Sequence, residues 1–285
     1  AAIKVSSEAV PTTKEDINWS FTKDGQEYQA VAVTADAFRS LGSYNTSSVD
    51  MSFPIAGDLS LTFQRAYSSF SGGQYGVGRG WSIFPATLYD NNPNHYINCS
   101  GANMPKSLAF VSQFGGFESF TITNCTTGYV ADDPAYNSVV VRNTDGTYTV
   151  RITNQTEFIF DTSFKLSKIK DKNGNTVSYN YNSLGKLVSV TDTKGHQITV
   201  NYGNFSGIDL ISSISDWSGR TISYNYDNQG NLLEVTDPKG NVTKYTYDSN
   251  FKLISITDRN NNVVLTNSYT DEAKIATQTN AANIT

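Results

Sequence analysis

Five aspartates recur at regular spacing in the second half of the chain, and carboxylates in series could bind calcium. They lie 21, 24, 21 and 21 residues apart, at Asp171, Asp192, Asp216, Asp237 and Asp258. Calcium takes six or more oxygen ligands, whereas each of these positions offers one carboxylate without a neighbouring acid. An aspartate that opens a turn can instead accept hydrogen bonds from the backbone amides that follow it. The spacing therefore favours turn capping over metal binding, and we expect no cofactor.

Aromatic residues follow the same spacing as pairs two residues apart, and flat exposed rings could stack on sugars. Because alternate residues share one strand face, such rings can also pack against each other across strands, with ~0.5–1.5 kcal/mol per aromatic pair. The constant phase favours packing, and carbohydrate binding through exposed Tyr and Trp stays an alternative. The pairs are Phe158/Phe160, Tyr179/Tyr181, Tyr224/Tyr226 and Tyr245/Tyr247, with Val200/Tyr202 as a variant.

Catalytic patterns are absent from the sequence. The two histidines, His95 and His196, accompany neither a Gly-x-Ser-x-Gly elbow nor a His-Glu-x-x-His motif, and no phosphate loop occurs. The net charge of −5 argues against a nucleic-acid partner, because phosphate binding needs clustered Lys and Arg. No apolar run approaches the ~20 residues of a membrane span. We therefore expect a protein that is not an enzyme and assign no catalytic, cofactor-binding or metal-binding residue.

The two cysteines and eight glycosylation sequons suggest an extracellular protein. A Cys99–Cys125 disulfide would close a 26-residue spacing and stabilise the fold by roughly 3 kcal/mol; two buried free thiols are the alternative. The start at Ala1, without a charged leader, is typical of a processed or truncated chain and fits export. The sequons are weak candidates for glycosylation, and they lie at Asn18, Asn45, Asn98, Asn124, Asn154, Asn204, Asn241 and Asn283.

These residues need short strands and tight turns to position them. Each unit of about 21 residues contains two runs of alternating polar and apolar residues, joined by turns that end in glycine. The pattern predicts an all-β fold: consecutive antiparallel hairpins over residues 158–261 in one twisted sheet. Its turns are expected at Gly174, Gly185, Gly195, Gly219, Gly230 and Gly240. We divide the chain into an extension (1–33), a β-rich capping region (34–157) and the hairpin array (158–285).

The repeat resembles that of the Rhs, or YD-repeat, proteins, which include bacterial polymorphic-toxin shells, wall-associated proteins and the teneurin barrel. The family unit is similar to Tyr-Asp-x-x-Gly-x-Leu-x-x-Val-Thr-Asp-x-x-Gly, and residues 226–240 match it closely. Residues 55–69 and 76–82 also resemble the segment that precedes such repeats. The resemblance implies a spiral sheet of hairpins, which in the family can enclose a cargo. This chain has only about six repeats and lacks the family's self-cleaving core, so the resemblance implies no catalytic residue.

Within the capping segment, Trp81 with the flanking Gly78 and Gly80 is expected to form a buried structural plug. Glycine permits close backbone approach, and the indole would cover the first hairpins. We expect a structural or adhesive component of an extracellular or cell-surface assembly, built by self-association or with other surface proteins. A fragment of a toxin-encapsulating shell is the first alternative, and a carbohydrate-binding module the second. Self-association could use the strand-like residues 28–33 or the last strands, because unpaired edges invite pairing with another chain.

Overall fold

The computed structural model describes residues 19–23, 26–30, 44–55, 57, 59–70, 76–83, 86–112, 117–270 and 274–280. Its regular elements are all strands within these ranges, and no helix long and apolar enough to cross a membrane occurs among them. The predicted all-β class is confirmed. The sequons at Asn18 and Asn283, and residues 31–33 of the strand-like stretch, lie outside the described ranges.

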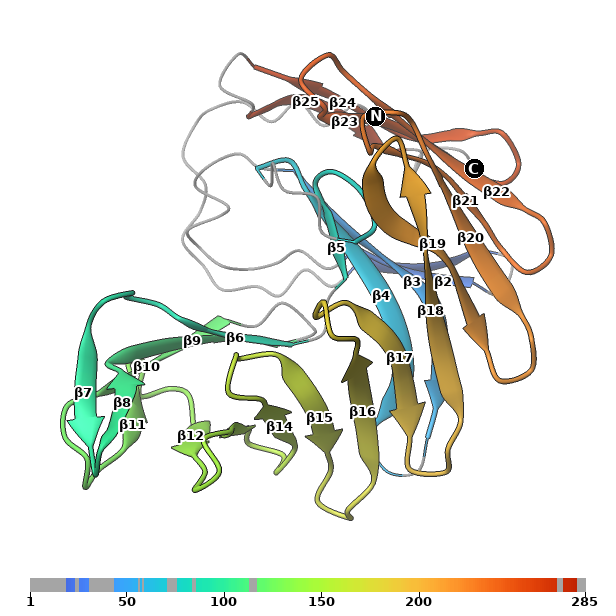
Figure 1. Cartoon of the computed structure of the whole chain (residues 1–285). Helices are drawn as coiled ribbons and strands as arrows, with labels where there is room; N and C mark the ends of the chain where they lie inside the picture. Colours follow the sequence, from blue (N-terminus) through green and yellow to red (C-terminus); the bar gives the residue numbers. More distant parts are fainter. Residues whose placement is uncertain are drawn as a thin grey trace. The chain divides into compact units, whose positions relative to one another are not determined.

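Fourteen strands form one antiparallel sheet in which every strand pairs with its neighbours in sequence (Figure 1). This order confirms the predicted tandem hairpins, and among the described residues β12 and β25 are the two outer strands of the sheet. The sheet begins at residue 139, whereas the sequence period places the start of the array at residue 158. The strands are β12 (Val139–Arg142), β13 (Tyr148–Arg151), β14 (Glu157–Phe160), β15 (Leu166–Lys170), β16 (Thr176–Tyr181), β17 (Leu187–Asp192), β18 (Gln197–Phe205), β19 (Ile208–Asp216), β20 (Thr221–Tyr226), β21 (Leu232–Thr236), β22 (Val242–Tyr247), β23 (Leu253–Thr257), β24 (Val263–Tyr269) and β25 (Ile275–Asn280).

The earlier strands form four smaller antiparallel sheets. One contains β3 (Asn45–Pro54), β4 (Ser60–Ser68) and β5 (Trp81–Ile83), and another has the order β11-β10-β9-β6. The strands of the second are β6 (Thr87–Asp90), β9 (Ser107–Val111), β10 (Phe117–Ile122) and β11 (Tyr129–Ala131). Two hairpins complete the set: β1 (Trp19–Lys23) with β2 (Gln26–Ala30), and β7 (Tyr96–Cys99) with β8 (Ala102–Pro105).

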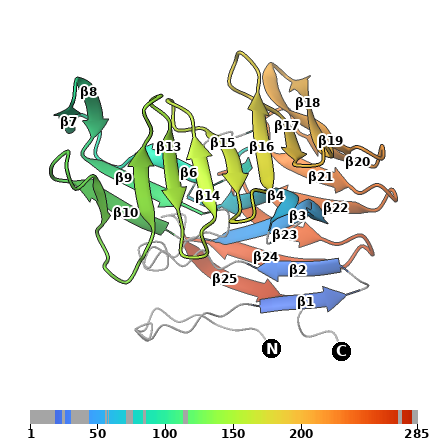
Figure 2. The ribbon, with the colours of Figure 1, turned by 90° about the horizontal axis from the view of Figure 1, so that it is seen from below.

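The chain divides into two compact units, each of which is described by itself below. The first contains residues 1–50, 63–83 and 199–285, and the second contains residues 51–62 and 84–198. In Figure 2 the strands β20 to β24 of the first unit follow one another in sequence order, as their pairing requires.

Side-chain alternation explains which face of each strand is buried. In β20, Ile222, Tyr224 and Tyr226 are buried, whereas the residues between them are exposed. Successive side chains of a strand point to opposite faces, so a period of two residues places all apolar groups on one side. The strand register shifts next to the second tyrosine of the pair in each of β16, β20 and β22. In β20 the shift lies between Asn225 and Tyr226. A bulge at this place bends the strand and increases its local twist.

Candidate functional site

The aspartate turns have a common geometry, which the turn at Asp237 illustrates. Its Oδ1 accepts hydrogen bonds from the backbone N–H of Lys239 (2.8 Å) and of Asn241 (2.9 Å), and its Oδ2 accepts one from Asn241 Nδ2 (2.8 Å). The Gly240 N–H donates to the Asp237 carbonyl at 2.9 Å, and φ at Gly240 is +83°. Both carboxylate oxygens are thus occupied by hydrogen bonds within the turn.

The same two backbone hydrogen bonds to Oδ1 recur at the other four regularly spaced aspartates, Asp171, Asp192, Asp216 and Asp258. The residue four positions later also reaches Oδ2, and it is Asn175, His196, Arg220 or Asn262. No three His, Cys, Asp or Glu side chains gather as a metal-ligand set in the described ranges. Turn capping and the lack of a metal ion both stay predictions.

Hydrogen bonding also sets the ionisation of these aspartates. At Asp192, Asp216 and Asp237 burial opposes ionisation, but the hydrogen bonds donated within each turn outweigh it and lower the pKa. At Asp171 the amide of Asn175 is the main cause of a lowered pKa. The charged form is therefore the one that the folded turns stabilise.

Four more turns at the opposite ends of the strands use the same cap; the sequence analysis predicted two of these turns, at Gly185 and Gly230, but did not identify their caps. Each cap accepts bonds from the backbone N–H groups two and four residues later. The signal was present in the Tyr-Asp-x-x-Gly part of the repeat. The caps are Asp161, Asn182, Asp227 and Asp248.

Each second tyrosine of a tyrosine pair, like Tyr269 in β24, has a hydrogen-bonding role that the sequence analysis did not identify. Its hydroxyl donates to the carbonyl of a leucine or isoleucine in the preceding strand. The bonds are Tyr181 to Leu166 (2.9 Å), Tyr226 to Ile211 (2.7 Å), Tyr247 to Leu232 (2.9 Å) and Tyr269 to Leu253 (2.8 Å). The first tyrosine of each pair is buried, with 4% of Tyr224 and of Tyr245 exposed. The inner-face rings therefore offer no flat surface to a sugar.

In the first unit Trp81 lies in an aromatic cluster with almost no exposed surface. It is 1% exposed, and its ring centre lies 5.3 Å from that of Tyr67 and 5.3 Å from that of Tyr245. The indole N–H donates to Tyr247 Oη at 2.9 Å. Such edge contacts with a satisfied polar group are typical of a structural tryptophan.

Gly78 and Gly80 precede this tryptophan, on either side of Arg79, in backbone conformations that disfavour a side chain. Their φ angles are +105° and +75°. A Cβ atom on Gly78 would lie 3.0 Å from the Gly230 carbonyl oxygen, and one on Gly80 would lie 2.7 Å from the Tyr67 ring. Between them, the Arg79 N–H donates to the Gly230 carbonyl at 2.9 Å. Close backbone approach thus joins this segment to the turn at Gly230.

A buried ion pair, which the sequence analysis missed, adjoins the tryptophan. Arg65 Nε donates to both carboxylate oxygens of Asp50 at 3.0 and 2.9 Å, and the two side chains are only 3% and 5% exposed. Arg65 Nη2 donates to Tyr245 Oη (2.9 Å), and Tyr224 Oη donates to Asp50 Oδ2 (2.7 Å). The guanidinium carbon lies 4.8 Å from the centre of the Trp81 ring. Burial alone would lower the pKa of Arg65, but Asp50 and the two tyrosines raise it.

The disulfide and the described sequons lie on turns, hairpins and strand ends. Cys99 and Cys125 are bonded with their Cα atoms 5.5 Å apart, so the pairing is the one that the sequence predicted. Asn98 and Asn124 precede these cysteines, while Asn154 lies in the turn after β13. Asn45 opens β3, Asn204 lies near the end of β18, and Asn241 is the last residue of the Asp237 turn.

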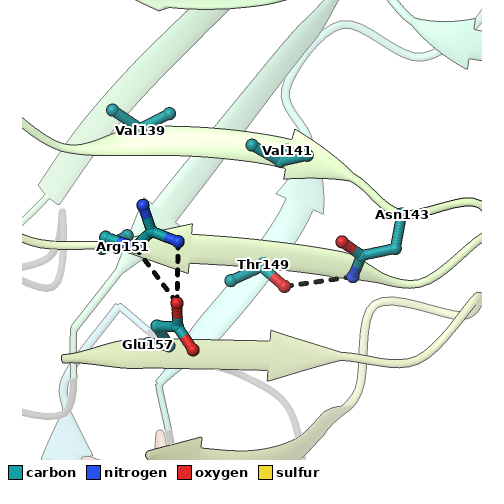
Figure 3. A pocket seen from close by; sticks show the side chains of 6 residues that line it. All are labelled: Val139, Val141, Asn143, Thr149, Arg151 and Glu157. Carbon is teal, nitrogen blue, oxygen red and sulfur yellow. Dashed lines mark hydrogen bonds and ion pairs between the residues drawn. The ribbon is translucent and has the colours of Figure 1, made fainter. Parts of the chain in front are cut away.

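One shallow hollow of about 280 Å³ lies on the exposed face of β12 to β14 (Figure 3). Val139 and Val141 line it, and Arg151 pairs with Glu157 at 2.8 Å across its floor. Asn143 Nδ2 donates to Thr149 Oγ1 at 3.0 Å. The polar groups of the hollow are thus paired with one another, and the exposed Arg151–Glu157 pair contributes little to stability.

Comparison with known families identifies the hairpin array. The model of the RHS Repeat family matches residues 207–241 and 226–263, which contain the aspartate turns and tyrosine pairs of β20 to β23. Residues 207–263 of the chain therefore match the RHS repeat. The matched residues cover part of the large sheet, and the turns at Asp171 and Asp192, outside the match, have the same capped geometry.

Two solved structures with some likeness to this chain contain TccC3. A crystal structure of TcdB2-TccC3-Cdc42 has 11% identity and a TM-score of 0.32, covering 84% of this chain and 15% of that one. A Tc holotoxin pore of Photorhabdus luminescens, mutated in TccC3, has 10% identity and a TM-score of 0.33, covering 90% of this chain and 17% of that one. The chain thus spans less than a fifth of the structures it matches. No curated protein matches it.

Proposed function

We propose that this chain is a non-enzymatic scaffold of an extracellular or cell-surface assembly, held together by strand pairing at the edges of its large sheet. The observation that supports this proposal is the open sheet order, which ends at β12 and β25 in the described part of the chain. An edge strand presents unpaired N–H and C=O groups to a further strand. The repeat family favours the scaffold role.

The β25 edge has the features of a pairing surface. Its sequence, from Ile275 to Asn280, contains neither proline nor a charged residue, which are the usual means of blocking an edge. Ala276 and Thr277 are exposed. A strand of a second chain can therefore add to β25 through main-chain hydrogen bonds.

Adding a charge to this edge tests the proposal. Thr277 Oγ1 pairs with Ser268 Oγ at 2.6 Å, and Thr246 Oγ1 pairs with Ser255 Oγ at 2.6 Å on the interior strands β22 and β23. Thr277→Lys and Thr246→Lys therefore remove equivalent bonds and add equal charges, but only the first changes an edge. We expect Thr277→Lys alone to weaken association in light scattering over a concentration series.

Deletion of residues 1–33 tests whether the extension takes part in this pairing. Loss of assembly, with the far-ultraviolet spectrum of the array unchanged, supports a strand-exchange role for the extension. A wild-type chain that stays monomeric at high concentration overturns the self-association proposal, because its edges are then covered by its own residues.

A second candidate role is that of one part of a larger RHS-type enclosure. It is favoured by the regular continuation of the sheet to β25, where a further hairpin of the same period would pair. The mass of the native polypeptide separates the two roles. A chain several times longer than 285 residues supports the enclosure, and a chain of about this length supports the assembled scaffold.

A further inference from the structure

The sequons differ in whether their asparagine amide is available for modification. Attachment of an N-linked glycan requires a free Nδ2, which forms the new bond, and an accessible hydroxyl on the third residue, which the transferase binds. The structure describes six of the eight sequons, those at Asn45, Asn98, Asn124, Asn154, Asn204 and Asn241. Both requirements can therefore be compared among them.

Asn124 meets both requirements. It lies in the exposed loop between β10 and β11, and Thr126, the third residue of its sequon, is also exposed. Its Oδ1 accepts hydrogen bonds from the backbone N–H groups of Thr126 (3.0 Å) and Thr127 (2.9 Å) and from Thr127 Oγ1 (3.1 Å). Nδ2 donates no hydrogen bond within the described residues.

This arrangement favours reaction at Nδ2. The turn across the sequon directs three donors at Oδ1, where negative charge develops as Nδ2 gives up a proton. The amide is held in one orientation by its oxygen, so the nitrogen can react without first breaking a hydrogen bond to the protein. The fold thus presents this amide in a form that can react.

Three other sequons have amides that donate to a side chain. Asn98 Nδ2 donates to Asn103 Oδ1 (3.1 Å), Asn204 Nδ2 to Asp209 Oδ1 (3.0 Å) and Asn241 Nδ2 to Asp237 Oδ2 (2.8 Å). Each bond must open before the nitrogen can react. Asn45 and Ser47, the first and third residues of another sequon, are half-buried, and each already has an interaction partner.

Asn154 meets only the first requirement. Its Oδ1 accepts the Thr156 N–H at 3.0 Å, as in the turn at Asn124. Thr156, however, is only 6% exposed, so its hydroxyl is not accessible to a transferase while the chain is folded. Asn124 alone among the described sequons combines a free amide with an accessible hydroxyl.

We propose that Asn124 is the acceptor of an N-linked glycan in the folded protein. The donor is a lipid-linked oligosaccharide. The bond between sugar C1 and the lipid phosphate oxygen breaks, a bond between C1 and Nδ2 forms, Nδ2 releases a proton, and the lipid phosphate leaves with the electron pair. The biological use of this site rests on the extracellular location proposed above, whereas its reactivity depends on the fold alone.

Modification of the folded chain in vitro tests the site without reference to location. The disulfide-intact protein, made in a host without N-glycosylation, is incubated with an oligosaccharyltransferase and a lipid-linked oligosaccharide, and occupancy is followed by peptide mass spectrometry. We expect Asn124 to react at least about tenfold faster than Asn98, because the Asn98 amide must first lose a hydrogen bond. Asn124→Gln should abolish the main product.

Asn98 is the matched control, because the two sequons flank one disulfide and both place cysteine in the middle. Thr126→Ser makes the Asn124 sequon identical in type to Asn98-Cys99-Ser100, and the preference for Asn124 should persist. Asn103→Ala frees the Asn98 amide and should raise its modification. In the reduced, alkylated and denatured chain the preference should disappear.

Equal rates at Asn98 and Asn124 in the folded chain overturn the proposal. So does a folded chain unmodified at Asn124 whose denatured form is modified there. Neither outcome bears on the self-association experiment, which uses unglycosylated protein.

Discussion

Arg65 and Asp50 are the residues whose structural role is least expected from their polarity. Their ion pair is buried, and it also holds the hydroxyl groups of Tyr224 and Tyr245. A buried charge is tolerated only when it is paired and hydrogen-bonded. The pair therefore ties β3 and β4 to the tyrosine face of β20 and β22 within the first unit.

Removal of one partner should be much more harmful than replacement of both. We expect Asp50→Ala to lower the free energy of unfolding by about 3–5 kcal/mol, because it leaves the Arg65 guanidinium buried without a counter-charge. The double variant Asp50→Leu with Arg65→Met should lose less than Asp50→Ala alone. Urea unfolding followed by circular dichroism measures both. A double variant as unstable as Asp50→Ala, or less stable, would contradict a coupled pair.

Trp81 should contribute to stability rather than to ligand binding. Trp81→Ala is expected to cost ~3–5 kcal/mol, as other truncations of buried aromatic residues do. Tyr247→Phe is the control, because it removes only the acceptor of the indole N–H and one backbone bond, at about 1 kcal/mol each. Denaturant midpoints test both variants. A Trp81→Ala protein of unchanged stability that loses binding to a ligand would reverse the assignment.

The sequence contained more information about Trp81 than about the ion pair of Arg65 and Asp50. Trp81 after Gly78 and Gly80 is a recognisable motif; the residue is buried, and its role as a plug stays a prediction. Arg65 occupies an inward position in the alternation of Leu61, Phe63 and Tyr67 in β4, which is a sequence signal for a buried charge. Its partner Asp50 lies on another strand, and no local pattern relates the two.

At the scale of the turns, the aspartate caps make stability depend on pH. The pKa values of Asp171, Asp192, Asp216 and Asp237 are lower in the folded chain, and that of aspartate in an unfolded chain is about 3.9. A lowered folded pKa gives a stabilisation that is complete above the unfolded pKa and is lost as the pH falls through the folded pKa. We expect the urea midpoint to be constant near neutral pH and to fall below about pH 4.

Substitution of all four aspartates by asparagine should remove this part of the pH dependence. Asparagine can still cap such a turn, since Asn182 Oδ1 accepts the N–H groups of Leu184 and Lys186 at 3.0 Å each. The variant should therefore fold, with a lower midpoint at neutral pH and a flatter acid limb. A slope that stays as steep as in the wild type would show that other groups cause the acid sensitivity.

The elements were predictable where the sequence repeats and less so elsewhere. The period of about 21 residues located the hairpins and the glycine turns of the array. It did not predict the turns at Phe164 and Phe251, where phenylalanine takes the glycine position at φ of +63° and +62°. These rings contact Tyr148 and Arg79, so tertiary contacts offset the cost of about 1–2 kcal/mol for a left-handed residue. Such contacts cannot be inferred from a repeat alone.

At the scale of the whole molecule, pairing between consecutive strands explains why the large sheet is regular and why its strand order is open. Each strand of the large sheet pairs with the strands before and after it in sequence, so the stability of the array is a sum of local and nearest-neighbour contributions. Such a sheet has no intrinsic end, and within the described residues β12 and β25 are its two outer strands. The scaffold role proposed here follows from that property together with the repeat family.

The Cys99–Cys125 disulfide connects two loops whose strands belong to different small sheets. Cys99 ends β7, and Cys125 follows β10. Because the bond restricts the unfolded chain across a 26-residue separation, we expect the Cys99→Ser, Cys125→Ser variant to lose roughly 3 kcal/mol. Thiol titration of the denatured, unreduced wild type should find no free thiol, and its mass should rise by about 2 Da on reduction, one hydrogen for each sulfur. Two reactive thiols, or a bond from either cysteine to another chain, would contradict the intramolecular bridge.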